Sequence, residues 1–290
     1  MNLLLGVILA FIALTTGSPL VALLLGISFT LLIGSNEELI LKSTGTKLLQ
    51  IGIVILGLTI SSSGAINLTT KYFPYISLFV IVIFLVGLIA SKILKIDTKL
   101  SMLLVSGTAI CGATAMVAIS PLIKAKPKDL LTSLGVIFIF NAIAIALLPI
   151  IGNNIEMSSE QFGSWMALAV HDTSSVIGAA MSFNDNSVET ATTLKLGRTL
   201  WLIPLIIIIG VVNKDNKSTK SIFPIFVLAF ILAIFAGNQL NFNEQVLAIL
   251  KNISSIFLVG ALFCIGTQIN LMSIKVINSR IIIFALLLWL

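Results

Sequence analysis

The stretch SGTAICGATA, Ser106 to Ala115, is small or hydroxyl-bearing at every position except Ile110. It lies inside an apolar segment, Ser101 to Ile123. A backbone in hydrocarbon must satisfy its hydrogen bonds internally, so such a run is tolerated where protein or a water-filled cavity surrounds it. We expect an interruption at the two glycines, which would turn a positive helix end toward an anion. The candidate substrate contacts here are Ser106, Gly107, Thr108, Cys111, Gly112 and Thr114.

The same stretch also fits a purely structural interpretation. Gly107, Cys111 and Ala115 recur every four residues, as do Ala109 and Ala113. This spacing of small residues lets transmembrane helices approach each other closely. Tight packing and a substrate passage therefore both remain open at this point.

The composition indicates a polytopic α-helical membrane protein. Of the 290 residues, 58% are hydrophobic and 10% are charged, and the mean hydropathy is +1.16. A soluble domain could not bury that much apolar material. The formal charge of +6 does not indicate nucleic-acid binding, because the lysines fall in short gaps between apolar runs, where they act as topology signals. Cys111 and Cys264 both lie in apolar segments, so we expect neither a disulfide framework nor a metal site.

Eleven apolar segments predict a single transmembrane domain over residues 1–290, with about 9–11 transmembrane helices. Two of the segments, 101–123 and 162–181, are predicted to be broken or re-entrant. The first two segments read as a helical hairpin rather than a signal peptide, because no Lys or Arg precedes Leu3 and Gly17-Ser18-Pro19 forms a turn. The last segment ends at Leu290 without a polar tail, which suggests a truncated helix.

The basic residues test the topology. If all eleven segments cross, the seventeen Lys and Arg residues divide ten to seven between the two sides. If both unusual segments enter and leave on one side, they divide thirteen to four. The positive-inside rule favours the second arrangement and places Lys92–Lys99 and Lys124–Lys128 in the cytoplasm. Segments of about twenty residues are nevertheless long enough to cross, so both arrangements stay open.

The second unusual segment contains AVHDTSSVIGAA, Ala169 to Ala180, with His171, the only histidine, beside Asp172. Ionisable groups at membrane depth usually face a cavity or a partner. Asp172 is expected to bind a coupling cation or proton, to neutralise Arg198, or simply to cap a half-helix that begins at Thr173. His171 is a candidate proton shuttle, or a histidine satisfied by a backbone carbonyl. Further candidate substrate contacts are Thr173, Ser174 and Ser175.

Arg198 and Lys195 stand one turn apart near the start of a predicted helix, Leu194 to Val212. The planar guanidinium of Arg198 can hold two oxygens of an oxyanion, so it is the expected fixed charge for an anionic substrate. Lys195 is expected to snorkel to the membrane interface. The amides Asn141, Gln268 and Asn270 are secondary candidates, since membrane amides usually bond a neighbouring helix.

A weak internal similarity suggests an inverted repeat. VILGLTIS, Val54 to Ser61, resembles FCIGTQIN, Phe263 to Asn270, with Gly57 aligned on Gly266. Many secondary transporters place their site between two inverted halves. Chance similarity between apolar helices explains eight residues equally well.

Four stretches resemble one membrane protein family. GTAICGATAMVAISPLIKAK, Gly107 to Lys126, is similar to a block of the YeiH-type UPF0324 proteins, whose members are usually named sulfate exporters. LLQIGIVILGLTIS, AVHDTSSVIGAA and TLKLGRTLWLIPL agree in order and spacing. The resemblance implies a relation to the bile acid, arsenite and riboflavin transporters and a fold with inverted repeats and crossing broken helices. Thr173 to Ser175 depart from a more polar family version, which leaves the substrate open.

Together these observations predict a secondary transporter of the bacterial inner membrane that moves a small anion of the sulfate, sulfonate or carboxylate class. Coupling to H⁺ or Na⁺ through Asp172 or His171 is a second hypothesis. An anion channel is the alternative, and an intramembrane hydrolase is disfavoured, because the chain lacks a paired aspartate or an activated serine. We expect no cofactor, no metal and no nucleic acid; the sequence allows a homodimer.

Overall fold

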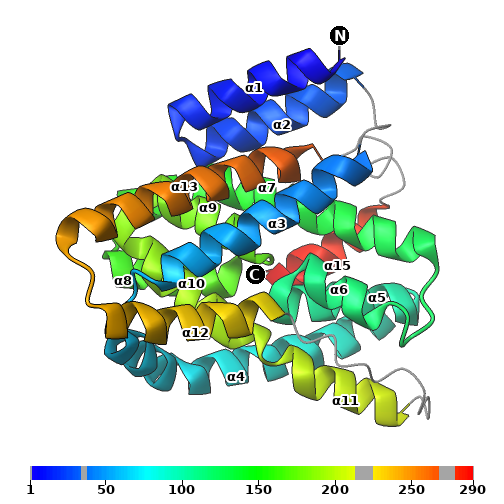
Figure 1. Cartoon of the computed structure of the whole chain (residues 1–290). Helices are drawn as coiled ribbons and strands as arrows, with labels where there is room; N and C mark the ends of the chain where they lie inside the picture. Colours follow the sequence, from blue (N-terminus) through cyan, green and yellow to red (C-terminus); the bar gives the residue numbers. More distant parts are fainter. Residues whose placement is uncertain (1, 34–37, 213–224, 268–277, 290) are drawn as a thin grey trace.

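The computed structural model describes residues 2–33, 38–212, 225–267 and 278–289, and the regular elements in these ranges are helices (Figure 1). The longer helices are α3 (Glu38–Gly57), α4 (Ser62–Ile93), α7 (Pro127–Asn154), α10 (Asp185–Thr199), which continues into α11 (Leu202–Val212), and α13 (Glu244–Gly266). The shorter ones include α1 (Asn2–Thr16), α2 (Pro19–Ile33), α12 (Ile225–Leu240) and α15 (Ser279–Trp289).

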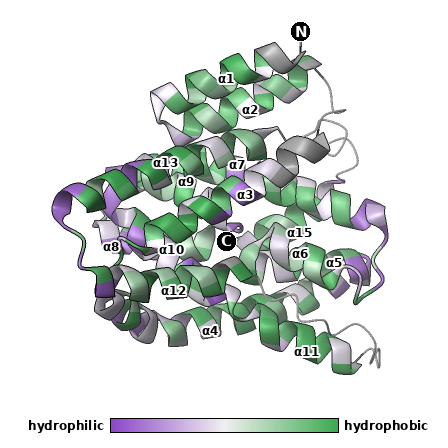
Figure 2. Ribbon diagram, in the orientation of Figure 1, coloured by the Kyte–Doolittle hydropathy of each residue, from purple (hydrophilic) through white to green (hydrophobic). Residues whose placement is uncertain are grey.

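The outer helices consist largely of hydrophobic residues (Figure 2). On α4, Leu78, Leu85 and Ile89 are exposed while Val80 and Ile83 are buried, so both faces of the helix are apolar. Such a helix is stable only where lipid replaces water on its outer side. In the described residues four helical stretches are long and apolar enough to cross a bilayer, namely Ser62–Ile93, Pro127–Asn154, Asp185–Val211 and Glu244–Gly266. The predicted all-α membrane fold is thereby confirmed.

Helices α1 and α2 form the predicted hairpin, which turns at Gly17 with φ +62°. The hairpin packs on α13 through a pair of glycines. A Cβ on Gly26 would lie 2.1 Å from the Phe263 carbonyl oxygen, and one on Gly266 would lie 2.3 Å from the Leu23 carbonyl oxygen. Small residues on both helices therefore permit backbone contact, as in other transmembrane pairs.

The first unusual segment is a broken helix that turns back on itself. It consists of α5 (Thr98–Ser106), one π-helical turn η1 (Gly107–Cys111), a break at Gly112 with φ +65°, and α6 (Ala113–Ile119). The Lys99 ammonium donates to the Lys124 carbonyl over 2.7 Å, so the segment leaves where it enters. It is a re-entrant hairpin, called hairpin 1 below.

The second unusual segment has the same form. Helix α8 (Ser159–Ala169) is followed by an extended break and by α9 (Thr173–Phe183). The rings of Phe162, at the start of α8, and Phe183, at the end of α9, stack with centroids 4.0 Å apart. Both ends of this segment, hairpin 2, therefore lie on one side of the protein.

The two hairpins enter from opposite ends. Helix α7 begins directly after hairpin 1 and ends directly before hairpin 2, and its 28 residues span about 42 Å. Figure 1 shows α5 and α6 at one end of the bundle and α8 at the other. The tips meet in between, because a Cβ on Gly112 would lie 2.7 Å from the Asp172 Cβ. The structure thus shows re-entrant hairpins that meet at their tips, where the resemblance implied broken helices that cross.

Each hairpin lies in its own apolar core. Hairpin 2 packs with residues of α2, α3 and α13, including Leu23, Ile53 and Leu262. Hairpin 1 packs with residues of α4, α11 and α15, including Ile83 and Phe284. The helical protein therefore contains two packed bodies, and the hairpin tips lie where they join.

The re-entrant arrangement is the one that the count of basic residues favours. The lysine-rich end of α4 and the first residues of α5 and α7 lie at the end of the bundle where hairpin 1 enters (Figure 1). The proposed internal repeat covers the last residues of α3 and of α13. The two helices pack against each other along their lengths. Residues 268–270, which belong to the second copy, lie outside the described residues. The inverted repeat remains a prediction.

The Gly112 contact can be tested against Gly17. Both have positive φ, but nothing lies within 4 Å of a Cβ on Gly17. We expect Gly17→Ala to lower the free energy of unfolding by about 1–2 kcal/mol, from backbone strain alone. Gly112→Ala adds a steric term against Asp172 and should cost about 2–5 kcal/mol in total. Unfolding of the detergent-solubilised variants measures both; equal losses would contradict the tip contact.

Candidate functional site

The interruption of hairpin 2 begins a new helix in the interior. Asp172 has extended backbone angles, and its Oδ1 accepts from the backbone N–H of Ser174 at 2.8 Å and of Ser175 at 3.2 Å. The hydroxyls of both serines also donate to the carboxylate. The sequence Asp-Thr-Ser-Ser thus forms an N-cap, as one of the predicted alternatives had it. These contacts leave Asp172 buried, at 7% exposure.

Asn141 of α7 joins the two residues of the break. Its Oδ1 accepts from the His171 backbone N–H at 3.2 Å and lies 3.1 Å from His171 Nδ1, while its Nδ2 donates to Asp172 Oδ2. A carbonyl oxygen requires a donor, so this contact assigns the proton to Nδ1 and leaves Nε2 as an acceptor. Asn141, predicted only as a secondary candidate, is the residue that positions both ionisable groups.

Arg198 of α10 connects the tips of both hairpins. Its Nε donates to the Ala109 carbonyl at 2.7 Å and its Nη2 to the Thr108 carbonyl, both in hairpin 1. Its Nη1 donates to the carbonyls of Ala167 and Leu168 in hairpin 2, each at 2.8 Å. Helix ends leave carbonyls unpaired and carry partial negative charge, which the guanidinium satisfies. The side chain is fully buried.

Lys195 lies one turn earlier and has the same kind of partner. Its ammonium donates to the Val170 carbonyl at 2.7 Å, and the side chain is fully buried. The prediction that Lys195 snorkels to the interface is therefore wrong. The physical reason is the helix boundary: α10 begins at Asp185, so Lys195 lies about 15 Å from the helix start instead of at it.

The predicted ion pair between Asp172 and Arg198 is also absent from the described contacts. Asp172 is surrounded by five hydrogen-bond donors from Asn141, Ser174 and Ser175. Arg198 directs Nε and both Nη atoms at backbone carbonyls. The Asp172 carboxylate is satisfied by donors at a helix N-terminus, and the Arg198 guanidinium by carbonyls at helix C-termini.

The remaining predicted contacts separate into four groups. Thr173, Ser174, Ser175, Thr108, Cys111 and Gly112 are buried at or beside the tips. Ser106 donates back to carbonyls of its own helix, at Met102 and Leu103, and Gly107 lets Met116 pack close, so both serve packing. Thr114 is exposed on α6. Gln268 and Asn270 lie outside the described residues.

Trp289 of α15 completes the site, although the sequence analysis did not single it out. Its indole N–H donates to the Ala169 carbonyl at 2.8 Å, and its ring meets that of Phe140 edge to face at 5.0 Å. The His171 ring lies 6.3 Å away. A buried tryptophan needs a hydrogen-bond acceptor for its indole N–H. A tryptophan in an apolar segment, such as Trp289, could therefore have been predicted from the sequence to bond an interior carbonyl.

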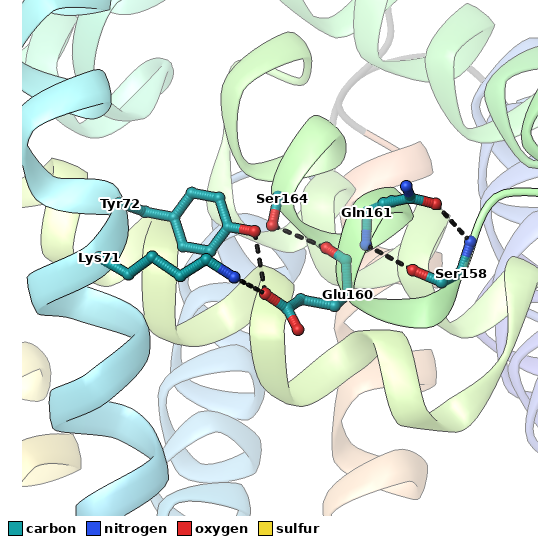
Figure 3. A network of polar contacts seen from close by, with 6 residues as sticks. All are labelled: Lys71, Tyr72, Ser158, Glu160, Gln161 and Ser164. Carbon is teal, nitrogen blue, oxygen red and sulfur yellow. Dashed lines mark hydrogen bonds and ion pairs between the residues drawn. The ribbon is translucent and has the colours of Figure 1, made fainter.

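The outer end of hairpin 2 is fixed to α4 by an exposed polar network (Figure 3). The Glu160 carboxylate accepts from the Lys71 ammonium at 2.7 Å and from the Tyr72 hydroxyl at 2.9 Å. These hydrogen bonds, the one from Lys71 first, lower the pKa of the Glu160 carboxyl. Ser158 and Gln161 form a capping box that starts α8.

The four ionisable side chains of the site are buried, at 7% exposure or less. Neither of the two described cavities, of about 320 and 210 Å³, is lined by His171, Asp172, Lys195 or Arg198. Among the described residues no three His, Cys, Asp or Glu side chains gather in a way that could hold a metal ion. The side chains that meet at the two hairpin tips are ionisable and buried, which suits them to recognising a charged solute: His171, Asp172, Lys195 and Arg198.

Arg198→Met should destabilise the protein strongly, because four interior carbonyls lose their donor. We expect a loss of about 3–5 kcal/mol in the free energy of unfolding. Lys71→Met removes the same charge from an exposed ion pair and should leave the unfolding midpoint nearly unchanged. Chemical denaturation in detergent compares the two. Similar midpoints for both variants would show that Arg198 does not hold the hairpins together.

The comparisons with known proteins agree with this membrane fold. The family model described as conserved hypothetical protein 698 matches residues 2–285. The chain is 38% identical to a UPF0324 membrane protein of Bacteroides thetaiotaomicron, over 94% of this chain and 83% of that protein. It is 34% identical to one of Vibrio parahaemolyticus, over 87% and 83%, and 30% identical to one of Streptococcus pneumoniae, over 94% and 86%. No solved structure matches. The chain belongs to the UPF0324 family of membrane proteins.

Proposed function

We propose that the protein is a secondary transporter for a small anion of the sulfate, sulfonate or carboxylate class. One observation carries this proposal: two re-entrant hairpins enter from opposite ends and meet at a buried cluster that contains Lys195, Arg198 and Asp172. Discontinuous helices with interior ends are the usual means by which transporters bind solutes at mid-membrane. Ionisable groups at that depth are costly and are commonly retained for transport.

The sign of the buried charge supports an anion. With Lys195 and Arg198 protonated, Asp172 ionised and His171 neutral, these buried side chains carry two positive charges and one negative charge. The interior helix ends carry roughly half an elementary charge each, and two N-terminal ends offset two C-terminal ends. The surplus is about one positive charge, which a bound monovalent anion, or a divalent oxyanion accompanied by a cation or proton, would balance.

Spare hydrogen-bond donors are present beside that charge. An ammonium has three N–H donors, and Lys195 uses one of them on Val170. A guanidinium has five, and four carbonyl contacts are made by Arg198. An oxyanion between the tips would therefore receive charge-assisted hydrogen bonds from residues that already hold the hairpins.

The hairpins also supply a route to alternating access. Because they enter from opposite ends, displacement of hairpin 1 would open the cluster to one side and displacement of hairpin 2 to the other. Gly112 is the natural pivot, since it alone separates η1 from α6. The two apolar cores would move past each other as packed bodies.

Orientation follows from the lysines. The positive-inside rule places the end at which hairpin 1 enters in the cytoplasm of a bacterium, with the protein in its cytoplasmic membrane. Hairpin 2, which begins at the exposed Glu160, then opens to the outer side.

Anion binding is tested first, by thermal unfolding of the purified protein with sulfate, methanesulfonate and acetate as sodium salts. A ligand of the native state raises the unfolding temperature as its concentration rises. We expect this for at least one anion with the wild type and with Lys195→Arg, but not with Lys195→Met. Lys71→Met is the matched loss of an exposed charge and should respond like the wild type. The proposal is refuted if the unfolding temperature of the wild type does not rise with the concentration of any of the anions, or if it rises equally in Lys195→Met.

Coupling is tested with Asp172→Asn in proteoliposomes. Asparagine also caps helices, so α9 should persist while the titratable carboxylate is removed. If Asp172 carries the coupling proton, uptake of the anion identified above should lose its pH dependence and fall at least tenfold. Uptake that is undiminished and still pH-dependent would exclude Asp172. His171→Gln, tested in parallel, shows whether His171 carries the coupling proton instead of Asp172.

A further inference from the structure

A cavity of about 320 Å³ lies between α4, α10 and α12, away from the hairpin tips. This volume is at the lower end of that of small-molecule sites, roughly 300–1,000 Å³. Successive helix residues point about 100° apart, so Thr193 and Gly197, which line the cavity, lie on a different face of α10 from Arg198. The cavity is thus separate from the proposed anion site, and the inference below does not depend on that site.

The cavity is long and apolar. Its lining runs from Ser62 to Thr70 on α4 and from Val227 to Phe235 on α12, about 12 Å along each helix. Apart from four hydroxyl-bearing residues near α4 and α10, the walls are aliphatic and aromatic, with Phe230 among the largest. An elongated apolar space of this kind fits a hydrocarbon chain.

One wall carries a hydroxyl without a partner. Thr193 is 5% exposed, and its Oγ1 forms no hydrogen bond to any residue in the described part of the chain. A helical threonine ordinarily donates to the carbonyl one turn earlier, as Thr199 does to Lys195 at 3.0 Å. A buried polar atom needs a partner, and Oγ1 is itself shielded in this rotamer, so a turn of the Thr193 side chain about χ1 is what would bring the hydroxyl to an acceptor on a ligand in the cavity.

The cavity opens toward lipid. Ile66, Ile231 and Phe235 line it and are 53%, 36% and 51% exposed, on helices whose outer faces are apolar. Figure 2 shows α12 as one of the hydrophobic outer helices. A molecule that reaches the cavity therefore comes from the surrounding bilayer, where phospholipid chains are the abundant apolar species.

We propose that the cavity binds an acyl chain of a bilayer phospholipid, with an ester carbonyl of that lipid accepting the hydrogen bond of Thr193 Oγ1. The bound chain fills the space beside Gly197, where an added Cβ would meet only Thr69 Cγ2, at 3.9 Å. It joins α12 to α4 and α10. Because α10 also carries Lys195 and Arg198, the lipid supports the helix that holds both hairpin tips.

Native mass spectrometry of the protein purified in a mild detergent tests this. We expect the wild type to retain one phospholipid and Gly197→Leu, which fills the cavity, to lose at least 80% of it, about a fivefold or larger loss of occupancy. Gly260→Leu is the matched control, because a Cβ there meets only Leu48 and Leu14, at 3.6 and 3.7 Å. It should retain the lipid. Added phospholipid should raise the unfolding temperature of the wild type and of Gly260→Leu only.

Thr193→Val tests the hydrogen bond without filling the cavity, and it should reduce retention severalfold. Thr15→Val removes a hydroxyl that bonds within α1 and should have no effect. The proposal is overturned if the wild type carries detergent alone, or if Gly197→Leu retains as much phospholipid as Gly260→Leu. Should Gly197→Leu fail to fold, retention by Thr193→Val equal to that of Thr15→Val overturns it instead.

Discussion

The structure depends on carbonyl groups that two interrupted helices leave unpaired in the interior. In water such groups would be solvated, but inside a membrane protein each needs a donor from the protein itself. Arg198 supplies hydrogen bonds to two carbonyls of each hairpin, and Lys195 supplies one to Val170. A single helical turn of α10 therefore connects two hairpins that enter from opposite ends.

The two kinds of helix end are satisfied in different ways. The N-terminal end of α9 is capped locally by Asp172 and by the serines that follow it. The C-terminal ends of η1 and α8 are satisfied by side chains 25 to 120 residues away in the chain. Asn141 then fixes the break from a third element, α7. The hairpin tips thus depend on one cap from neighbouring residues and on several hydrogen-bonding side chains from distant parts of the chain.

This arrangement connects the architecture with the proposed transport of an anion. Lys195 and Arg198 donate to the interior helix ends, so the residues needed to build the fold are the same ones that the proposal assigns to the solute. Helix α10 is the common wall: one face touches the hairpin tips and another lines the lipid-facing cavity. Movement of either hairpin must therefore alter hydrogen bonds to the same helix.

Composition and local pattern alone determined the membrane class, the α-helical fold and the first hairpin, predicted both interrupted segments, and offered the cap at Asp172 as one of three alternatives. Each of these follows from residues close together in the chain, such as Gly112 within a small-residue run or Asp-Thr-Ser-Ser before a helix. Only the tertiary structure decided that both segments are re-entrant, that Lys195 is buried and that Arg198 serves carbonyls instead of Asp172. The reason is that a carbonyl left free by a break has no sequence signature of its own: its partner is whichever donor the packing of α10 and α15 brings within reach.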